Sequence, residues 1–545
     1  MRPVLVFHRD HCLACRSCEL ACSVAHSESA ELEAAIAEEF PPTRRVVVAA
    51  DGDGLEALRC EQCLEPLCAF ACKSGALRRD PATGRVMLDD ARCVGCFMCL
   101  MVCPFGIRPD PARDRVVRCD VCEGRTTPAC VEACPTGALC AHTPPDERVR
   151  SDFQGHVVVV GSSAAGIAAC EAAREHAPAC SITLVTADSS PYSRPLLSYA
   201  LAGRLQPQQT DWRAEDYLDN ELGVHVLGGR NAVRLESVLG PLVLDDGTEL
   251  AFDRLILATG ARAAGLSIPG ANLAGVFVLR DAKDLEAISD WCGSASATPH
   301  AVVLGGGNVG LQACEAFLAR GLRVTVVVAS PHLLSQMVDS EAGRRLADLF
   351  RARGVNVRTG RDAVEVVGGE RVEAVRLDNG ELLPADLVLV AKGIVPNVEW
   401  LRDSGIRIGR GISVDLSGRT SVPGIFAAGD CAEAPDPLTG RLSLSGIWPV
   451  AYEMGRAAGS TAVGIERASA GALRMNASRF FGESIISVGE VRPERLEGSH
   501  AEIPVNRDGA YRKLVYRDGR LAGALLYGDI TGAGSYYREY RKGAS

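Results

Sequence analysis

The stretch HVVVVGSSAAG, residues 156–166, decides how the larger part of this 545-residue chain folds. An apolar strand runs directly into Gly161, Ser163 and Gly166, and the helix-like segment IAACEAAREHA follows. A second apolar run, ITLVTAD, ends near Asp188. This order of strand, glycine turn, helix, strand and acid is typical of a dinucleotide-binding unit: glycines admit the pyrophosphate, the helix N-terminus faces its charge, and the acid accepts from ribose hydroxyls. Ser163 stands where the middle glycine is usual.

A second copy of this pattern begins at AVVLGGGNVG, residues 301–310, with Gly305, Gly307 and Gly310. The helix-like segment LQACEAFLAR and the strand-like segment RVTVVV follow it. Two such units in one chain predict two bound dinucleotides. Further apolar strands end in polar or glycine-rich turns, where ligands lie in parallel sheets. These are LILATG (255–260), DLVLVAKG (386–393) and GIFAAGD (424–430).

Cysteine divides the chain into two unequal parts. Of 22 cysteines, 17 lie in the first 140 residues and 5 in the remaining 405. Sixteen of the 17 form four groups of four, the third and fourth each followed by proline. The groups are Cys12, Cys15, Cys18 and Cys22; Cys60, Cys63, Cys68 and Cys72; Cys93, Cys96, Cys99 and Cys103; and Cys119, Cys122, Cys130 and Cys134.

This spacing is typical of 4Fe-4S clusters. Three thiolates two residues apart wrap one face of a cluster, and the fourth points at a different cluster, so the groups come in pairs that exchange their last ligand. Sixteen ligands suffice for four clusters. Zinc is the alternative, but zinc ribbons use separated pairs of cysteines rather than packed triplets with a trailing Cys-Pro. Cys140 is unmatched, and we expect it to be a small buried residue.

Composition sets limits on partners and location. The net charge is −10, the pI is near 5.6, and no basic run occurs, so nucleic acid is excluded as a partner. The N-terminus lacks the apolar core of a signal peptide, and no apolar run approaches the length of a membrane span. We therefore expect a soluble, cytoplasmic protein, in which dense cysteine indicates metal or redox sites rather than disulfides.

Residues 1–140 resemble the four-cluster ferredoxin-like electron-transfer subunits of molybdenum, tungsten, hydrogenase and carbon monoxide dehydrogenase systems, a resemblance carried by all four cysteine motifs. In that family the first group pairs with the fourth and the second with the third. The resemblance thus implies four ligand sets: Cys12, Cys15, Cys18 and Cys134; Cys119, Cys122, Cys130 and Cys22; Cys60, Cys63, Cys68 and Cys103; and Cys93, Cys96, Cys99 and Cys72.

Residues 155–545 resemble a FAD-dependent pyridine nucleotide-disulfide oxidoreductase, on the segments GSSAAG, PYSRPLLS (191–198), ATG (258–260), LRD (279–281), GGGNVG and FAAGD. The resemblance implies FAD at Gly161, Ser163, Gly166, Asp188, Arg194, Thr259, Gly260, Arg280, Gly429 and Asp430. It implies NAD(P) at Gly305, Gly307, Gly310, Gly393 and Asn397. It also implies a helix that starts around Trp448 and points its N-terminus at the flavin, and a C-terminal interface domain from about Met475.

The predicted fold class is α/β. A ferredoxin-like α+β four-cluster domain (1–140) is followed by a linker (141–154), a FAD-binding Rossmann-like domain (155–270 and 385–465) and a NAD(P)-binding Rossmann-like domain (271–384). An α+β interface domain (466–545) completes the chain.

Departures from the family pattern are informative. Disulfide reductases carry a cysteine just after the first dinucleotide unit, but this chain has SRPLLSYALAG there. Cys170 and Cys314 lie in the two Rossmann helices, where we expect core positions. Cys431 lies closest in sequence to the predicted flavin site, and we expect it to be structural. The acid expected after the second unit's second strand falls on Val328, and with no cationic cluster in its place NAD is favoured over NADP.

The combination predicts an enzyme, an oxidoreductase that passes electrons between a partner enzyme, four 4Fe-4S clusters, FAD and NAD(P), because a flavin exchanges both single electrons and hydride. No molybdopterin, tungsten or nickel signature occurs, so we expect the partner to be a separate subunit of the tungsten aldehyde oxidoreductase, carbon monoxide dehydrogenase or hydrogenase type. One alternative is a self-contained NAD(P)H-dependent reductase of sulfur, polysulfide or another small acceptor, which needs a thiol such as Cys431. Another is a non-catalytic iron–sulfur scaffold.

Overall fold

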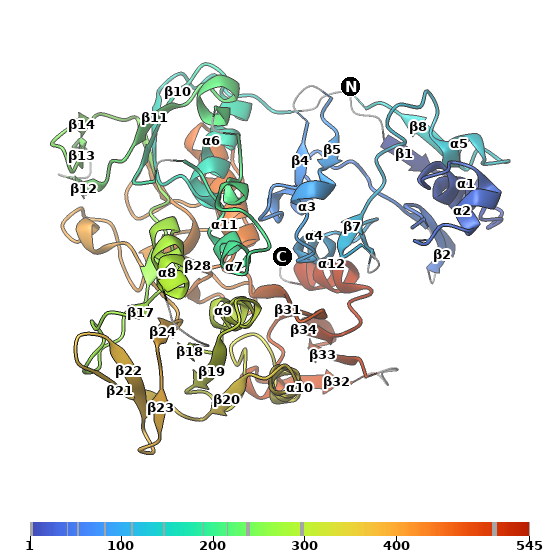
Figure 1. The fold of residues 1–545 in the computed structure, drawn as a ribbon. Coiled ribbons are helices and arrows are strands. Elements are labelled where there is room, and N and C mark those ends of the chain that lie inside the picture. Colours follow the sequence, from blue (N-terminus) through green and yellow to red (C-terminus); the bar gives the residue numbers. More distant parts are fainter. Residues whose placement is uncertain are drawn as a thin grey trace. The chain divides into compact units, whose positions relative to one another are not determined.

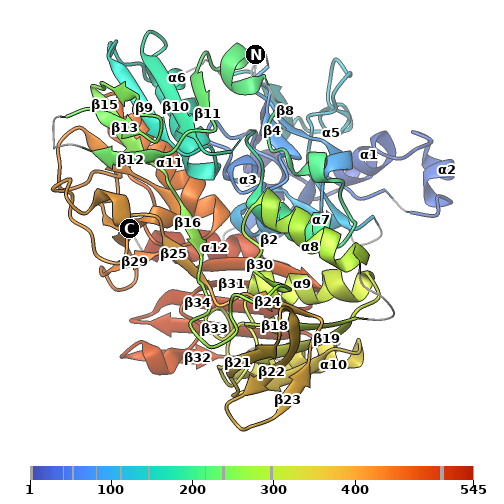
Figure 2. The same cartoon turned by 60° about the vertical axis from the view of Figure 1, so that its left-hand side comes forward.

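A computed structural model of the chain describes residues 4–40, 42–51, 54–80, 83–110, 113–144, 148–188, 190–214, 216–235, 240–294, 299–503 and 509–543. The chain divides into two compact units (Figures 1 and 2). Unit 1 contains Met1–Arg148 and Thr531–Glu539, and unit 2 contains Val149–Ile530 and Tyr540–Ser545.

Unit 1 consists of short elements around buried cysteines. A small core of Leu5, Val46, Val48 and Leu139 packs directly against several of the thiols. Its strands form antiparallel pairs: β1 (Val4–Phe7) with β8 (Leu139–His142), β2 (Val47–Asp51) with β3 (Gly54–Leu58), β4 (Leu77–Arg79) with β5 (Val86–Leu88), and β6 (Arg108–Asp110) with β7 (Arg115–Val117). Its helices are α1 (Ser17–Ala25), α2 (Leu32–Ile36), α3 (Leu67–Phe70), α4 (Met98–Val102) and α5 (Ala129–Glu132).

The first two residues of the expected linker belong to strand β8, which continues to His142. Residues 145–147 of that linker lie outside the described residues.

A segment from the far end of the sequence completes unit 1. Thr531–Glu539, which includes the start of helix α12 (Ala533–Gly543), groups with the N-terminal cysteine-rich residues. Gly534 lies against the backbone of Cys103, so close that a Cβ added at Gly534 would be 2.0 Å from the Cys103 carbonyl oxygen.

Unit 2 contains two five-stranded parallel sheets of the same kind. The first has the order β11 (His225–Gly228), β10 (Ser181–Thr186), β9 (His156–Val160), β15 (Arg254–Leu257) and β27 (Ile425–Ala427). The second has the order β17 (Val276–Phe277), β24 (Leu387–Val390), β18 (His300–Leu304), β19 (Arg323–Val328) and β20 (Asn356–Thr359). Val157, Val158 and Val159 are fully buried, as expected for a parallel sheet covered on both faces.

Helices and small antiparallel sheets cover these parallel sheets. The helices of unit 2 include α6 (Ala164–His176), α7 (Leu197–Leu201), α8 (Ala282–Ser294), α9 (Asn308–Ala319), α10 (Ser340–Ala352) and α11 (Trp448–Ala462). One three-stranded sheet is β12 (Ala232–Leu235), β13 (Leu242–Leu244) and β14 (Glu249–Leu250), and another is β21 (Ala363–Gly368), β22 (Val372–Leu377) and β23 (Leu382–Pro384). Short strands β16 (Ala261–Ala263) and β25 (Ile394–Pro396) pair with each other, and β26 (Ile412–Ser413), β28 (Ala432–Pro435) and β29 (Leu442–Leu444) form a further sheet.

An antiparallel sheet follows α11, with the order β30 (Met475–Phe480), β31 (Glu483–Gly489), β34 (Arg520–Tyr527), β33 (Tyr511–Arg517) and β32 (Ser499–Glu502). The predicted mixed α/β class with Rossmann-type sheets is confirmed. The finer domain limits expected from the sequence stay a prediction.

Helix α11 lies unusually close to helix α6. A Cβ added at Gly455 would lie 2.1 Å from the carbonyl oxygen of Ala165, and one at Gly459 would lie 2.3 Å from that of Ala169. The two glycines are four residues apart, so they share one face of α11 and let the two backbones touch. The start of α11 at Trp448 agrees with the start that the family resemblance implies.

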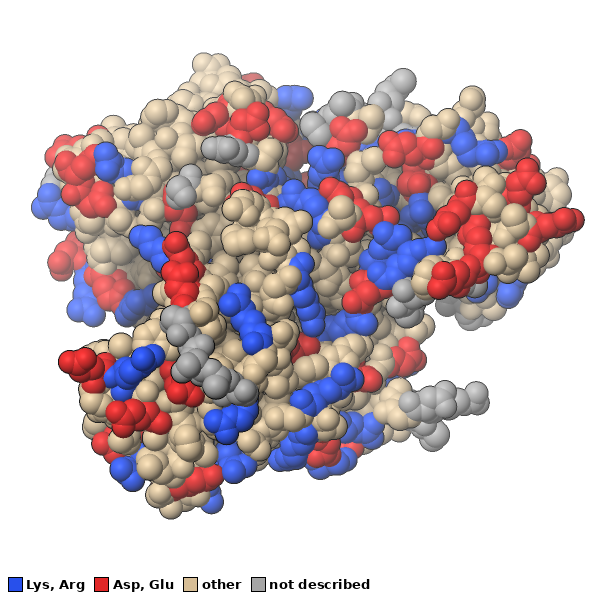
Figure 3. Space-filling model, viewed as in Figure 1, with Lys and Arg blue, Asp and Glu red and all other residues tan. Residues whose placement is uncertain are grey.

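No described helix is both long and apolar enough to cross a membrane. On the face seen in Figure 3, basic and acidic side chains are interspersed rather than gathered by sign.

Replacing Gly459 by alanine is expected to lower the free energy of unfolding by about 1–3 kcal/mol, because the methyl group has no room against α6. Gly293→Ala, in helix α8 with no atom near its Cβ position, is the matched control. There we expect a gain of up to about 1 kcal/mol from helix propensity alone. Chemical denaturation of both variants measures the difference, and equal stability of the two would contradict the close packing.

Candidate functional site

The four cysteine loops of unit 1 share one backbone feature. The residue two positions after the first cysteine of each group has a left-handed conformation: Ala14 (φ 54°), Gln62 (φ 47°), Gly95 (φ 61°) and Val121 (φ 59°). In three loops the N–H of this residue donates to the first cysteine's Sγ at 3.4 Å. Such N–H groups stabilise a thiolate, and the repeated turn gives all four loops the same local shape.

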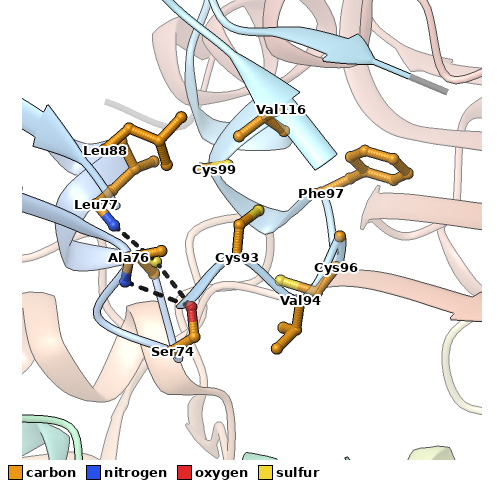
Figure 4. Close-up of a pocket in the computed structure, with 12 residues that line it drawn as sticks. Ser74, Ala76, Leu77, Leu88, Cys93, Val94, Cys96, Phe97, Cys99 and Val116 are labelled. Carbon is orange, nitrogen blue, oxygen red and sulfur yellow. Dashed lines mark hydrogen bonds between the residues drawn. The ribbon is translucent and has the colours of Figure 1, made fainter. Parts of the chain in front are cut away.

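The structure brings the cysteines of different groups together as four sets. Set A is Cys12, Cys15, Cys18 and Cys134, which line one pocket with Phe7, Val48 and Leu139. Set D is Cys93, Cys96, Cys99 and Cys72, which line another pocket (Figure 4). In set D the N–H of Leu77 donates to Cys72 Sγ at 3.2 Å.

The members of the other two sets are recognised because their thiols raise one another's pKa. In set B (Cys119, Cys122, Cys130 and Cys22), burial together with the nearby thiols of Cys22 and Cys122 raises the pKa of Cys130 to about 12. In set C (Cys60, Cys63, Cys68 and Cys103), burial raises the pKa of Cys63 to about 12, with contributions from Cys60 and Cys103. Each set contains three cysteines from one group and the last cysteine of another.

Three pairs of neighbouring sets contain thiols that act on one another electrostatically. After burial, the thiols that raise the pKa of Cys130 include Cys18, which joins set B to set A. Cys119 is influenced in the same way by Cys60, which joins B to C, and Cys99 by Cys68, which joins D to C. The order is therefore A, B, C, D.

The sulfur spacing distinguishes an iron–sulfur cluster from a single zinc ion. Four thiolates around one zinc lie about 3.8 Å apart, given a Zn–S distance of about 2.3 Å. Among the described residues, which include all sixteen cysteines, no three thiols have sulfurs within 4.8 Å of one another. The sets therefore surround something larger than one ion, and the residues present fit a multi-iron cluster better than zinc.

A polar network beside set B was not predictable from the sequence. His26 lies with Nδ1 3.8 Å from Cys22 Sγ and Nε2 3.0 Å from Asp120 Oδ1, and Arg45 donates to the same carboxylate at 2.6 Å. The Arg45 N–H also donates to Cys22 Sγ at 3.2 Å. These side chains fix the position of Cys22, and only the tertiary fold brings them together.

In unit 2 the first glycine loop has the steric limits of a dinucleotide site. Gly161 has φ 113°, and a Cβ there would lie 2.2 Å from the carbonyl oxygen of Ala258. A Cβ at Gly166 would lie 1.7 Å from the carbonyl oxygen of Gly161. Ser163 is the N-cap of α6, and its side chain makes no capping hydrogen bond.

The second loop repeats this geometry. Gly305 has φ 129°, with its Cβ position 2.2 Å from the carbonyl oxygen of Ala391, and the Cβ position of Gly310 is 2.1 Å from the carbonyl oxygen of Gly305. Gly307 is the N-cap of α9 and faces open space, as does Gly393 (φ 105°).

Four of the charged residues predicted for the flavin site form a connected chain. Arg194 donates to Asp188 at 2.7 Å and to the backbone carbonyl of Arg280 at 3.3 Å. Arg280 in turn donates to Asp430 at 2.9 Å. Segments far apart in the sequence thus meet along the carboxyl ends of the first sheet.

Asn397, predicted for the nicotinamide site, lies against two residues predicted for the flavin site. Its side-chain amide donates to the Thr259 carbonyl at 3.0 Å, its carbonyl accepts from Thr259 Oγ1 at 2.9 Å, and its N–H donates to the Gly260 carbonyl at 3.0 Å. Asn397 therefore joins the turn after β15 to strand β25. Gly429 (φ 78°) approaches α6, with its Cβ position 2.9 Å from Ala165 Cβ.

The residues around the two loops fit dinucleotides. Neither α6 nor α9 has a side chain that caps its first N–H groups, which leaves them for a pyrophosphate. Near the first loop, Ser193 Oγ and Trp448 Nε1 are buried without a hydrogen-bond partner among the described residues, as expected of polar atoms that meet a bound ligand.

A buried ionic cluster between α6 and α11 is a second feature that the sequence did not reveal. Glu171 accepts from Arg213 at 3.0 Å, from Tyr217 at 2.7 Å and from Tyr452. Burial would raise the pKa of Glu171, but Arg213 and the two hydroxyls hold it below its usual value. This cluster fixes α11, whose N-terminus begins at Trp448.

The cysteines outside the four sets have different environments. Cys170, Cys314 and Cys431 are fully buried, so the expected core positions are confirmed. Cys431 donates to the Leu257 carbonyl at 3.3 Å, and burial raises its pKa, as expected of a structural thiol. The expectation that Cys140 is buried is wrong: it is partly exposed, with Sγ 3.5 Å from His8 Nε2, because the edge strand β8 turns it outward.

Two parallel sheets with matching glycine loops, one with connected charged residues at its carboxyl ends, define the class of two-dinucleotide oxidoreductases. The chain belongs to the pyridine nucleotide-disulphide oxidoreductase family, whose pattern matches residues 155–455. Residues 55–143 match a 4Fe-4S dicluster domain, and residues 475–542 match the C-terminal domain of rubredoxin NAD+ reductase.

Several known proteins are similar to this chain. Nitrite reductase [NAD(P)H] of Bacillus subtilis is 31% identical over 378 residues, which are 69% of this chain and 46% of the relative. The NADH-dependent phenylglyoxylate dehydrogenase subunit epsilon of Aromatoleum evansii is 32% identical over 67% of this chain and 86% of its own length. The structure of a NAD-dependent persulfide reductase from A. fulgidus matches with a TM-score of 0.67 and 28% identity, over 71% of this chain and 77% of that one. The chain spans less than half of the Bacillus subtilis nitrite reductase.

Thiol labelling of the folded protein tests these cysteine environments. We expect iodoacetamide to modify Cys140 in the native state, and Cys170, Cys314 and Cys431 only after unfolding, since alkylation needs an accessible thiolate. Peptide mass spectrometry before and after denaturation measures this. Native labelling of Cys431 would contradict the buried position described above.

Proposed function

We propose that this protein passes electrons between a nicotinamide nucleotide and a separate redox enzyme, by way of FAD and four 4Fe-4S clusters. The observation that carries the proposal is the presence of cysteine-lined pockets in the same chain as two glycine loops of dinucleotide type. A non-catalytic scaffold would need neither loop.

Sets A to D each hold one cluster in this proposal. Sixteen cysteines give four thiolates to each, and N–H groups such as those of Gln62 and Val121 offset the negative charge on the sulfurs. The apolar lining of the pockets, including Leu139 at set A and Leu88 at set D, restricts water and so influences the reduction potential.

FAD is held at the first loop by Gly161, Ser163, Gly166 and the chain of Asp188, Arg194, Arg280 and Asp430, with Thr259, Gly260 and Gly429 beside it. A bound flavin supplies the conversion between the two-electron chemistry of nicotinamide and the one-electron chemistry of clusters. NAD(P) is held at Gly305, Gly307, Gly310 and Gly393, with Asn397 between the two sites. The nucleotide we propose is NAD.

The side chains of this chain bind and orient rather than transfer protons. Asp188 is positioned by Arg194 to accept from ribose hydroxyls, and the uncapped start of α6 faces a pyrophosphate. No thiol follows the first dinucleotide unit in the segment PYSRPLLS, and Cys431 is buried, so a cysteine relay has no candidate at the flavin. The self-contained reductase of sulfur or polysulfide therefore lacks the thiol that it needs.

The names of two related proteins support the proposal that the partner enzyme is a separate subunit. The assimilatory nitrate reductase electron transfer subunit of Bacillus subtilis and the phenylglyoxylate dehydrogenase subunit epsilon are, by name, parts of larger systems. The partner classes we propose are the tungsten aldehyde oxidoreductase, carbon monoxide dehydrogenase and hydrogenase types, as the likeness of the cysteine-rich part implies.

Protein purified without oxygen is expected to contain roughly sixteen irons and one FAD per chain. NADH is expected to bleach first the flavin absorbance and then the cluster absorbance, because both lie in one chain. Stopped-flow spectroscopy follows the two bands. If the flavin is reduced but the clusters never are, electron transfer within the chain is refuted.

Removing one ligand of a set tests the assignment of the clusters. We expect Cys15→Ala in set A or Cys99→Ala in set D to lower the iron content by about four of roughly sixteen, with FAD content unchanged. Cys140→Ala is the matched control and should keep all the iron, since Cys140 belongs to no set. Equal iron in all three variants would contradict the assignment.

A further inference from the structure

The second glycine loop lacks the usual group that reads the adenosine ribose. In a dinucleotide unit an acid at the end of the second strand binds the ribose 2′-hydroxyl, or an arginine there binds a 2′-phosphate. Strand β19 ends at Val328, and Ala329 and Ser330 follow it. None of the three is an acid or an arginine, and the hydroxyl of Ser330 already donates to the His332 carbonyl at 3.2 Å and accepts from Ser335 at 2.9 Å.

An ion pair bridges this gap from the neighbouring strands. Lys392, two residues after strand β24, donates to Asp362, three residues after strand β20. In the sheet, β18 and β19 lie between β24 and β20. The pair therefore extends across the carboxyl ends of the two strands that carry the glycine loop and the ribose-reading position.

Backbone contacts hold both partners next to these strand ends. The N–H of Arg361 donates to the carbonyl of Val328, the last residue of β19, at 3.2 Å. Asp362 is the next residue along the chain, so its backbone lies beside the end of β19. On the other side, the N–H nitrogen of Lys392 lies 3.4 Å from the Cβ position of Gly305, the first glycine of the loop. Both side chains keep access to solvent, with 27% of Lys392 and 44% of Asp362 exposed.

The charges at this edge cancel. Asp362 neutralises Lys392, and Asp378 lies 4.0 Å from the guanidinium of Arg361. A 2′-phosphate brings about two negative charges and needs a cation without a partner, whereas a 2′-hydroxyl needs only an acceptor, which the Asp362 carboxylate is.

We propose that the Asp362–Lys392 pair determines nucleotide specificity, with Asp362 selecting NADH by supplying the ribose acceptor and by occupying the lysine that would otherwise bind the 2′-phosphate of NADPH. This inference rests on the proposed function, because it assigns a reader to the second dinucleotide site. It locates specificity in the strands on either side of β18 and β19.

The test measures binding of two probes that differ only in the 2′-phosphate, 5′-AMP and adenosine 2′,5′-bisphosphate, to the intact FAD- and cluster-loaded protein by calorimetry. We expect Asp362→Asn to improve the affinity for the bisphosphate relative to 5′-AMP by about tenfold, since the substitution frees the lysine but keeps the shape of the side chain. Adding Lys392→Met to it should return the ratio to the wild-type value. The ratio of kcat/KM for NADPH and NADH should move in the same direction.

Glu381→Gln is the matched control, because it breaks an equally exposed ion pair with Arg358 on the same sheet. It should leave the probe ratio within about twofold of wild type. A ratio unchanged in Asp362→Asn, while both probes bind, would overturn the specificity proposal and leave the proposed function intact. Failure of wild-type protein to bind either probe or NADH would instead overturn the proposed function and this inference with it.

Discussion

A left-handed backbone residue stands in each of the four cysteine loops and in both glycine loops of this chain. At Gly161 and Gly305 the conformation brings the loop into contact with the neighbouring strand, where a Cβ would lie 2.2 Å from a carbonyl oxygen in both cases. Three of the four corresponding residues in unit 1, Ala14, Gln62 and Val121, are not glycine. Each such residue costs roughly 1–2 kcal/mol, so the four loops keep their shape only because other interactions fix it.

The cysteine loops and the glycine loops differ in how they meet this constraint. In unit 2 the glycines avoid the steric cost and let α6 and α9 start directly above the sheets. In unit 1 the cost is offset by N–H···S hydrogen bonds and by burial of the thiols. Burial raises the pKa of Cys18 to about 11, so its thiolate form needs compensating positive charge, which the iron of the proposed cluster would supply.

Sequence reasoning succeeded where one residue type or one short spacing dictates the local structure. The strands and helices around Gly161 and Gly305 were predicted because few other patterns allow so close a backbone approach. Tertiary partners were not predictable in this way. Glu171 and Tyr452 are 281 residues apart, and the periodicity of α6 gives no sign that one of its residues is a buried acid. The Lys392–Asp362 pair and the contact of His26 with Asp120 depend on the same kind of long-range arrangement.

The same limit explains Cys140. Its place outside the four cysteine groups suggested a small core residue, but among the described strands β8 pairs only with β1, and Cys140 is partly exposed. A sequence shows which residues alternate along a strand but not whether a second layer covers each face.

The return of Thr531–Glu539 to unit 1 has a consequence for biosynthesis. A ribosome makes the cysteine-rich residues well before the segment that packs Gly534 against Cys103, because residues 149–530 lie between them in the sequence. Domains generally fold as they emerge, N-terminal first, but this one must wait for the whole flavin-binding part to be translated before its surface is complete. The backbone at Cys103 therefore stays uncovered until Gly534 has been made, so the surroundings of this cysteine are completed only after residues 149–530.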